Sequence, residues 1–387
     1  MACLPASAAA VPAADSGNEL AASLWRSFIA KYNEFSLNPL DAGALDTKAR
    51  AALIGTAGAQ FRSWKPDRQP TFPELLDAVM AKDASITKFE RTEQTLTALL
   101  PQIDKYGSYK SAADIAQWNE ALKKNRGSIQ MTLDQSPDGR VLCYPVADGP
   151  AEQAGVHAGA QLLAVDKRPA EGKSIAALRL EFVGPPDSRI ELKIRQPQGK
   201  IENLTLTRTD KDAPVVTTTK TPLGVTVRIR RFDPGSAIAI KQQLEAYPKP
   251  GRLTLDLRGN GGGVRDEALL AASLFFPEGT ALGKFTTREG VQTANDANGV
   301  YVEPGSIQIL QDGRTASAAE YLIATLKEGF PDKVTLFGKK TYGKCHSTAR
   351  VNLEGGGELS ITEAALATAS GKSWDGTGIP PDQADKE

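Results

Sequence analysis

The stretch Leu255-Asp-Leu-Arg-Gly-Asn-Gly-Gly-Gly263 places an apolar, strand-like run directly before a glycine loop. The residues that follow, Arg265–Phe275, carry apolar side chains at helical spacing, so the pattern predicts a strand, a tight turn and a helix. Similar strand and helix patterns alternate on both sides of this stretch, at Gly224–Ile229, Ser236–Ala246, Ile307–Leu310 and Ser317–Lys327. Strands that alternate with helices in this way are typical of an α/β domain.

The sequence before this α/β region has two other patterns. Apolar residues recur at three-to-four spacing up to about residue 125, as in helices, and short Val, Leu and Ile runs between Pro and Gly follow, as in a small β-rich module. We therefore predict a multidomain α+β protein. Its expected parts are a signal-like or disordered N-terminus (1–17), a helical N-terminal region (18–125), a β-rich module (126–210) and an α/β core (211–387).

The composition disfavours several functional classes. The 387 residues include 46 Lys and Arg against 46 Asp and Glu, so an electrostatic attraction to nucleic acid or to an acidic membrane surface is not expected. No apolar run is long enough to predict a membrane span. The cysteines and histidines are too few and too scattered to predict a zinc site, so we expect no metal and no cofactor. They are Cys3, Cys143, Cys345, His157 and His346. A bridge between Cys143 and Cys345 stays open.

The glycine loop does not fit a nucleotide site. In Gly259-x-Gly261-x-x-Val264 the dinucleotide fingerprint fails at its last position, and no Gly-Lys-Ser/Thr follows. Residues without a Cβ let the main chain approach a reacting carbonyl closely, so the N–H groups of this loop can stabilise an oxyanion. A plain strand-to-helix turn is the alternative interpretation.

Two polar side chains further along are candidates for catalysis. Ser317 stands at a predicted helix start, where the helix dipole favours negative charge, but with Glu320 it also forms a capping box, so helix capping is the alternative role. Lys344 lies in the loop Thr341-Tyr-Gly-Lys-Cys-His346. Because an ordinary lysine has a pKa of about 10.4, a lysine base must be buried to be neutral near pH 7. A solvated surface charge is the alternative for Lys344.

The segment Gly149–Asp166 resembles the signature of PDZ domains. It matches that signature at Pro150, Ala151, Ala154, Gly155, Gly159, Leu163 and Val165. PDZ domains bind an extended peptide by strand addition and hold its terminal carboxylate on backbone N–H groups of a loop. The resemblance places this tail-binding loop at Ser128, Ile129, Gln130 and Met131. The alternative is that Ile129 and Met131 are core residues of the first strand.

The last domain resembles the carboxyl-terminal processing (tail-specific) proteases of the S41 peptidase family. Four blocks carry the resemblance: Leu255–Gly263, Thr315–Glu320, Thr341–Cys345 and Gly371–Asp382. It implies that Ser317 is the nucleophile and Lys344 its base. It also implies an oxyanion hole formed by the main-chain N–H of Ala318 and of either Gly262 or Gly263.

One position departs from this family pattern. In this family, a glutamine four residues after the lysine base often orients that lysine. The corresponding position in this sequence is Thr348. A hydroxyl can accept a hydrogen bond from an ammonium, so Thr348, or else His346, is a candidate for supporting the dyad. The departure leaves a rival open, an inactive relative that captures peptide tails through its PDZ module. A second rival is a hydrolase in which His346 is the base or Cys345 the nucleophile.

Taken together, the resemblance implies a serine endopeptidase that works through an acyl-enzyme. We expect its substrates to be proteins with exposed apolar C-termini, and we expect neither nucleic acid nor a membrane as a partner. The small, apolar N-terminal stretch resembles the end of a secretory signal, so we expect export to the bacterial periplasm or cell envelope. The helical region is expected to gate substrate delivery or to mediate assembly into a homo-oligomer.

Overall fold

The computed structural model describes residues 14–58, 61, 69–124, 126–136, 138–146, 148–247, 249–295 and 301–384. Most of the predicted signal-like segment 1–17, including Cys3, lies outside the described residues. The described residues divide into two compact units. The first unit combines the residues up to Ala116 with Thr287–Glu289 and Ser347–Ala365, and the second combines Gln117–Thr286, Gly290–His346 and the residues from Leu366 onward. The mixture of helices and strands confirms the predicted α+β class.

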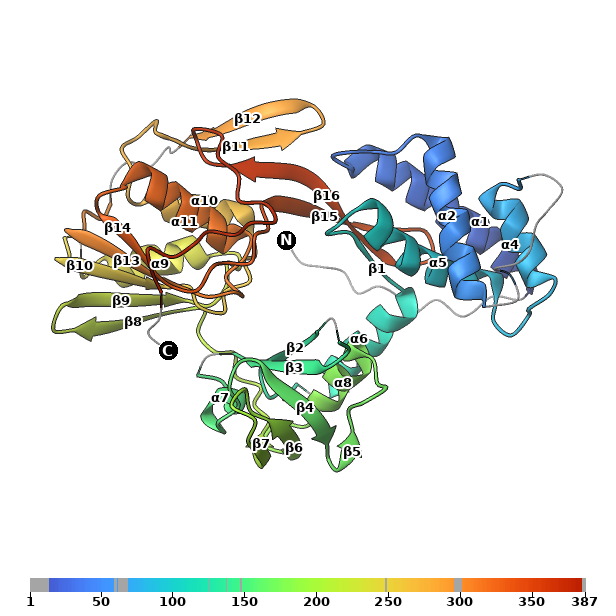
Figure 1. Cartoon of the computed structure of the whole chain (residues 1–387), viewed down its shortest axis with the longest axis horizontal. Coiled ribbons are helices and arrows are strands. Elements are labelled where there is room, and N and C mark those ends of the chain that lie inside the picture. Colours follow the sequence, from blue (N-terminus) through green and yellow to red (C-terminus); the bar gives the residue numbers. More distant parts are fainter. Residues whose placement is uncertain are drawn as a thin grey trace. The chain divides into compact units, whose positions relative to one another are not determined.

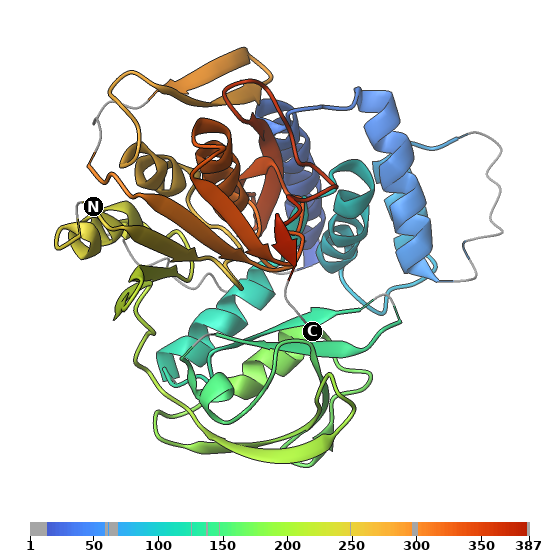
Figure 2. The same cartoon turned by 60° about the vertical axis from the view of Figure 1, so that its left-hand side comes forward.

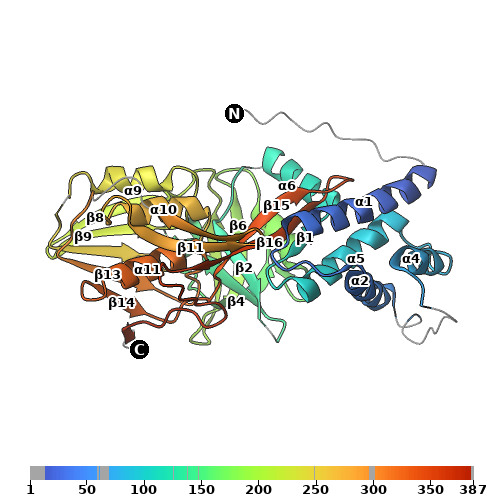
Figure 3. The same ribbon diagram turned by 90° about the horizontal axis from the view of Figure 1, so that it is seen from above.

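The first unit is built on packed helices (Figure 3). These are α1 (Ala14–Phe35), α2 (Ala42–Ala57), α4 (Phe72–Met80) and α5 (Lys88–Ile103). Their apolar faces meet in one core, in which Leu24, Phe28 and Leu96 are fully buried. A capping box begins α5, because Thr87 Oγ1 accepts from the N–H of Glu90 at 3.1 Å and the Thr87 N–H donates to the Glu90 carboxylate at 2.7 Å.

Three strands complete this unit. The short strand β1 (Ser108–Lys110) pairs antiparallel with β16 (Glu358–Ala367), and β15 (His346–Asn352) also pairs with β16. Asp104, which follows α5, holds β16 in place, because its carboxylate accepts hydrogen bonds from the N–H and the hydroxyl of Thr362 at 2.6 and 2.7 Å. The segment Glu354-Gly-Gly-Gly357 between β15 and β16 contains the glycines typical of a hairpin turn. Strand β1 is too short to give a pattern and depends on a partner far away in the chain.

The second unit contains a small β-rich module with its own core (Figures 1 and 2). Its sheet has the order β2-β3-β4-β6-β7, and β5 pairs with β4. Its elements are β2 (Met131–Gln135), β3 (Val141–Pro145), α7 (Pro150–Gln153), β4 (Ala160–Val165), β5 (Arg168–Pro169), α8 (Ile175–Phe182), β6 (Arg189–Arg195) and β7 (Ile201–Thr207). Helix α6 (Ala112–Lys124) precedes the module and contains the boundary between the two units. Strand β2 lies at the edge of the sheet, beside α8.

The rest of the second unit is the predicted α/β arrangement (Figure 1). A sheet of order β17-β14-β13-β10-β9-β8 has parallel pairs throughout, except that β8 is antiparallel to β9. Helix α10 packs against both α9 and α11. The elements are β8 (Val216–Thr221), β9 (Gly224–Ile229), α9 (Ser236–Leu244), β10 (Arg252–Asp256), α10 (Arg265–Ser273), β11 (Ala281–Thr287), β12 (Gly290–Asn295), β13 (Ser306–Gln311), α11 (Ala318–Gly329), β14 (Val334–Gly338) and β17 (Gln383–Ala384).

The strand order decides where a site can form. Because β10, β13 and β14 are adjacent and parallel, their carboxyl ends lie at the same edge of the sheet. The loops that leave this edge are the glycine loop, the loop before Ser317 and the loop that contains Lys344. Three motifs that are far apart in the sequence are therefore brought to one end of the sheet, which is the usual position of sites in such folds.

Candidate active site

Ser317 lies in a sharp turn between β13 and α11. Its backbone has φ 56° and ψ −119°, a left-handed conformation that is costly for a residue with a Cβ. The side chain is half-buried, and the next two residues, Ala318 and Ala319, are fully packed. A non-glycine residue held in such a conformation at the junction of a strand and a helix is typical of a nucleophile presented on a tight turn.

The glycine loop touches this turn directly. A Cβ at Gly262 would lie only 2.8 Å from the Ala316 carbonyl oxygen and 2.8 Å from Ser317 Cβ, so no other residue fits there without a shift. The Gly262 N–H donates to Asn260 Oδ1 at 2.8 Å. Asn260 is fully buried, and its side-chain NH₂ group donates to the Ile229 carbonyl at 3.0 Å. The backbone carbonyl of Asn260 accepts from the Ala316 N–H at 2.9 Å. One asparagine thus joins the glycine loop to the serine turn.

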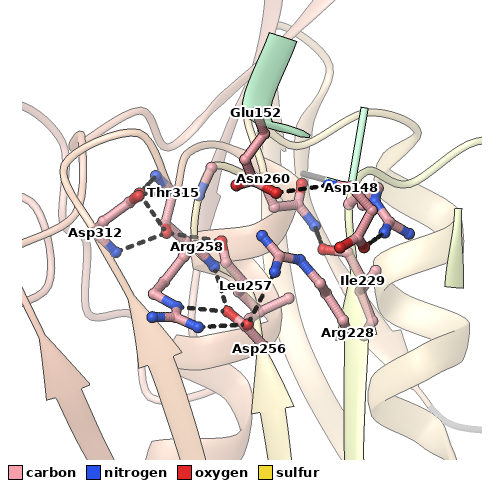
Figure 4. Close-up of polar contacts among 12 residues, drawn as sticks. Asp148, Glu152, Arg228, Ile229, Asp256, Leu257, Arg258, Asn260, Asp312 and Thr315 are labelled. Atoms are coloured by element: carbon pink, nitrogen blue, oxygen red, sulfur yellow. Dashed lines mark hydrogen bonds and ion pairs between the residues drawn. The ribbon is translucent and has the colours of Figure 1, made fainter. Parts of the chain in front are cut away.

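Further polar contacts hold the base of the loop (Figure 4). The Thr315 hydroxyl donates to the Leu257 carbonyl at 2.9 Å, and Asp312 accepts from the N–H groups of Gly259 and Thr315, both at 3.0 Å. Asp256, at the end of β10, binds Arg258 through two side-chain hydrogen bonds of 2.9 and 2.8 Å. Burial would raise the pKa of Asp256, but the Arg258 guanidinium outweighs it and holds the pKa of this carboxyl below its ordinary value.

Glu320 connects the serine turn to the lysine loop. Its carboxylate is completely buried and accepts four hydrogen bonds. One oxygen accepts from the Thr341 hydroxyl at 2.5 Å and the Gly343 N–H at 2.7 Å, and the other accepts from the N–H of Ser317 at 2.9 Å and of Lys344 at 2.8 Å. The sequence suggested only a capping role for Glu320, because the contacts from the lysine loop arise in the folded chain.

The lysine loop brings Lys344 to the same end of the sheet as Ser317. Lys344 is half-buried, and the loop is fixed on its other side because the Ile379 N–H donates to the Thr341 hydroxyl at 2.7 Å. His346 Nδ1 lies 3.1 Å from Asp375 Oδ1, and the buried Cys345 Sγ lies 2.9 Å from Ser373 Oγ. Thr348 belongs to the first unit, whereas Lys344 belongs to the second.

Two further predictions concern the cysteines. Cys143 and Cys345 are both free and buried, so they do not form the bridge that the sequence left open. Burial raises the pKa of the Cys345 thiol, so this side chain is mostly protonated at neutral pH and is a weak nucleophile. This environment counts against the rival in which Cys345 attacks the substrate.

The predicted tail-binding residues lie together at the start of the small sheet. Ile129 is fully buried and Met131 is nearly so, and both belong to the module core, although only Met131 lies in the first strand, β2. The Ser128 N–H donates to the Thr209 carbonyl at 2.9 Å, so this donor is already bound. Gln130 has φ 49° and donates through its side-chain amide to the Lys211 carbonyl at 2.6 Å. All four residues line one cleft of about 950 Å³.

Replacement of Gly262 by alanine is expected to damage the site. The added Cβ meets backbone and Ser317, and the residue has φ +100°, so we expect a stability loss of about 1–3 kcal/mol. A displacement of the serine turn is expected to reduce turnover by about 10²-fold or more. Gly261→Ala is the matched control, because a Cβ there meets no described atom within 4 Å. Urea unfolding and a cleavage assay check both variants, and equal behaviour of the two would contradict the close approach.

Residues 225–384 match the model of Peptidase family S41. This matched segment lies within the α/β core and contains the glycine loop, the serine turn and the lysine loop. In the described part of the chain, no helix is both long and apolar enough to cross a membrane.

The chain is also similar to individual bacterial proteases. It is 29% identical over 264 residues to the carboxyl-terminal-processing protease of Synechocystis, across 66% of this chain and 61% of that protein. It is 27% identical over 286 residues to a "Probable CtpA-like serine protease" of Staphylococcus aureus, across 72% of this chain and 56% of that protein. This chain therefore spans little more than half the length of these relatives.

The fold is also similar to that of a solved structure, a photosystem II D1 C-terminal processing protease. The TM-score is 0.67, and the alignment covers 96% of this chain and 93% of that one. The sequence identity is 22%, so this similarity concerns the fold.

Proposed function

We propose that the chain is a serine endopeptidase in which Ser317 is the nucleophile and Lys344 is its base. The observation that carries this proposal is the buried Glu320 carboxylate, which binds the backbone N–H groups of both residues. A helix cap needs only the Ser317 half of that arrangement. The contacts to the lysine loop have no role in capping, and they support a function that needs the serine and the lysine in fixed positions.

The proposed reaction is acyl transfer in two steps. Neutral Lys344 removes the proton from the Ser317 hydroxyl, whose oxygen attacks the scissile carbonyl carbon, and the protonated lysine then gives its proton to the leaving amine. Water attacks the resulting ester, with Lys344 as base again, and releases the acid product. The N–H of Ala318 and the N–H of Gly263 are proposed to bind the oxyanion, because the Gly262 N–H is bound by Asn260.

We also propose that residues 126–210 are a PDZ-like domain that delivers peptide tails. Its edge strand β2 can accept an added strand, and the cleft beside it is lined by residues of the predicted tail loop, by Phe182 of α8 and by Gly259 of the glycine loop. A peptide in this cleft would therefore run toward the glycine loop of the α/β core. Relatives named as processing proteases are consistent with this substrate class. Export of the protein to the cell envelope belongs to the same proposal.

A cleavage assay with two versions of one substrate tests this function. An unfolded reporter with a free apolar C-terminus is expected to be cut by the purified chain. The same reporter with an amidated C-terminus is expected to be cut at least about tenfold more slowly, because the amide has no negative charge and accepts weaker hydrogen bonds than the carboxylate does. Equal rates would contradict tail recognition. Binding of the free tail without any cleavage would contradict the peptidase and favour the peptide-capture rival.

A further inference from the structure

A cluster of metal-ligating side chains lies next to the lysine loop. Cys345 Sγ, one ring nitrogen of His346 and one carboxylate oxygen of Asp375 all lie within 4.8 Å of one another. His346 Nδ1 and Asp375 Oδ1 are 3.1 Å apart. Cys345 is buried, whereas His346 and Asp375 are half-buried, so the cluster has one side inside the protein and one that an ion can reach.

The three donors form a set with a clear chemical preference. Sulfur, imidazole nitrogen and carboxylate oxygen together are ligands of zinc and of similar borderline-soft divalent ions. With zinc bonds of about 2.0–2.3 Å, ligand atoms in a tetrahedral site lie about 3.3–3.8 Å apart. The His346–Asp375 separation of 3.1 Å is slightly below that range, and all three donor atoms lie within 4.8 Å of one another, so the donors are close to the spacing of a zinc site. Ser373 Oγ, 2.9 Å from the sulfur, or a water molecule can occupy a fourth position.

We propose that Cys345, His346 and Asp375 bind a divalent transition-metal ion of the zinc type. The thiol loses its proton to solvent when the ion binds, because the thiolate is the ligand. The imidazole binds through a ring nitrogen that carries no proton, so a proton on that nitrogen is also released, and the carboxylate binds through one oxygen. The sequence alone does not predict this site, because its ligands are not a closely spaced pair of the kind found in zinc motifs. Asp375 comes from a segment 29 residues beyond His346, so only the fold brings it to the cluster.

The position of this site suggests what it affects. Cys345 and His346 directly follow Lys344, so an ion bound to both fixes the end of the lysine loop. The ligands do not include Ser317, Lys344 or Glu320, and metal binding is therefore a property separate from the proposed peptidase activity. An inactive protein with the same fold would still bind the ion.

Cobalt(II) binding to the full chain tests the proposal, since a thiolate ligand gives cobalt a charge-transfer absorption in the near ultraviolet. We expect this band to saturate at one equivalent and to disappear when Zn²⁺ is added, because zinc binds such sites more tightly than cobalt does. Cys345→Ser is expected to abolish the band. His346→Ala and Asp375→Asn are expected to weaken Co²⁺ binding at least about tenfold, since even indirect partners of a metal contribute that much.

The chain offers matched controls for each ligand type. Cys143→Ser removes another buried cysteine, and His157→Ala removes the second histidine; both are expected to keep the band and the affinity of wild type. Cys3→Ser serves as the common background. Circular dichroism checks the fold of each variant. If Cys345→Ser does not fold, the weaker Co²⁺ binding expected for His346→Ala and Asp375→Asn, whose side chains are half-buried, still tests the proposal. A wild-type protein without the band, or a band that survives Cys345→Ser, would overturn the proposal.

Discussion

Replacing Ser317 by alanine is expected to reduce cleavage of an unfolded reporter by at least about 10⁴-fold, the scale expected when a nucleophile is removed. The fold is expected to persist, because alanine and serine are equally strained at φ 56° and Ser317 stands on a turn held by its neighbours. We therefore expect a change in unfolding free energy of no more than about 1–2 kcal/mol, the value of a helix cap. Cleavage rates and urea unfolding measure the two effects.

Ser317→Gly is the control that separates strain from chemistry. It is expected to be equally inactive, yet more stable than Ser317→Ala by about 1 kcal/mol, since glycine adopts this backbone conformation without the Cβ penalty. Lys344→Ala is expected to lose cleavage to a similar degree, while its loop stays anchored through backbone contacts to Glu320. An active, well-folded Ser317→Ala protein would contradict the assignment of the nucleophile.

Glu320→Gln is expected to have the second largest effect. The new amide keeps the size of the side chain but replaces an oxygen acceptor with a donor, facing N–H groups that then lack a partner. Each charged hydrogen bond contributes about 1.5–3 kcal/mol, so we expect a loss of about 2–4 kcal/mol in unfolding free energy. Because the serine turn and the lysine loop both lose an anchor, turnover is expected to fall by about 10²-fold.

A second glutamate of α11 provides the comparison. Glu328 is half-buried near the far end of the helix and accepts from the N–H and hydroxyl of Ser370 at 2.9 and 2.6 Å. Glu328→Gln is expected to cost less than about 1–2 kcal/mol and to leave turnover close to wild type. If both glutamate variants lost stability but kept full turnover, Glu320 would be structural only.

Much of the fold could be predicted from the sequence. The strand Gly224–Ile229 was predicted with the observed bounds, and the helices after β9, β10 and β13 were predicted to within a few residues, because buried strands and amphipathic helices have different periods. The hairpin β11–β12 and the short β1 were missed. Strand β12 is mostly exposed and β1 has only three residues, so neither carries a clear apolar alternation.

The candidate site was predictable in part. The glycine loop, Ser317 and Lys344 stand in recognisable motifs, and the parallel strand order brings their loops to one edge of the sheet. What the sequence could not reveal are the buried connections, namely Asn260 between the glycine loop and the serine turn, and Glu320 between that turn and the lysine loop. Both depend on contacts between segments that are distant in the sequence, and local spacing carries no signal for them.

The most direct test of the Ser–Lys account is to identify the residue that becomes covalently modified. The full chain is treated with a fluorophosphonate, which reacts with activated serines, and the digested protein is mapped by mass spectrometry. We expect one modified peptide, which contains Ser317, with slower labelling in Lys344→Ala and none in Ser317→Ala. Labelling at another residue, or equal labelling rates in wild type and Lys344→Ala, would contradict it.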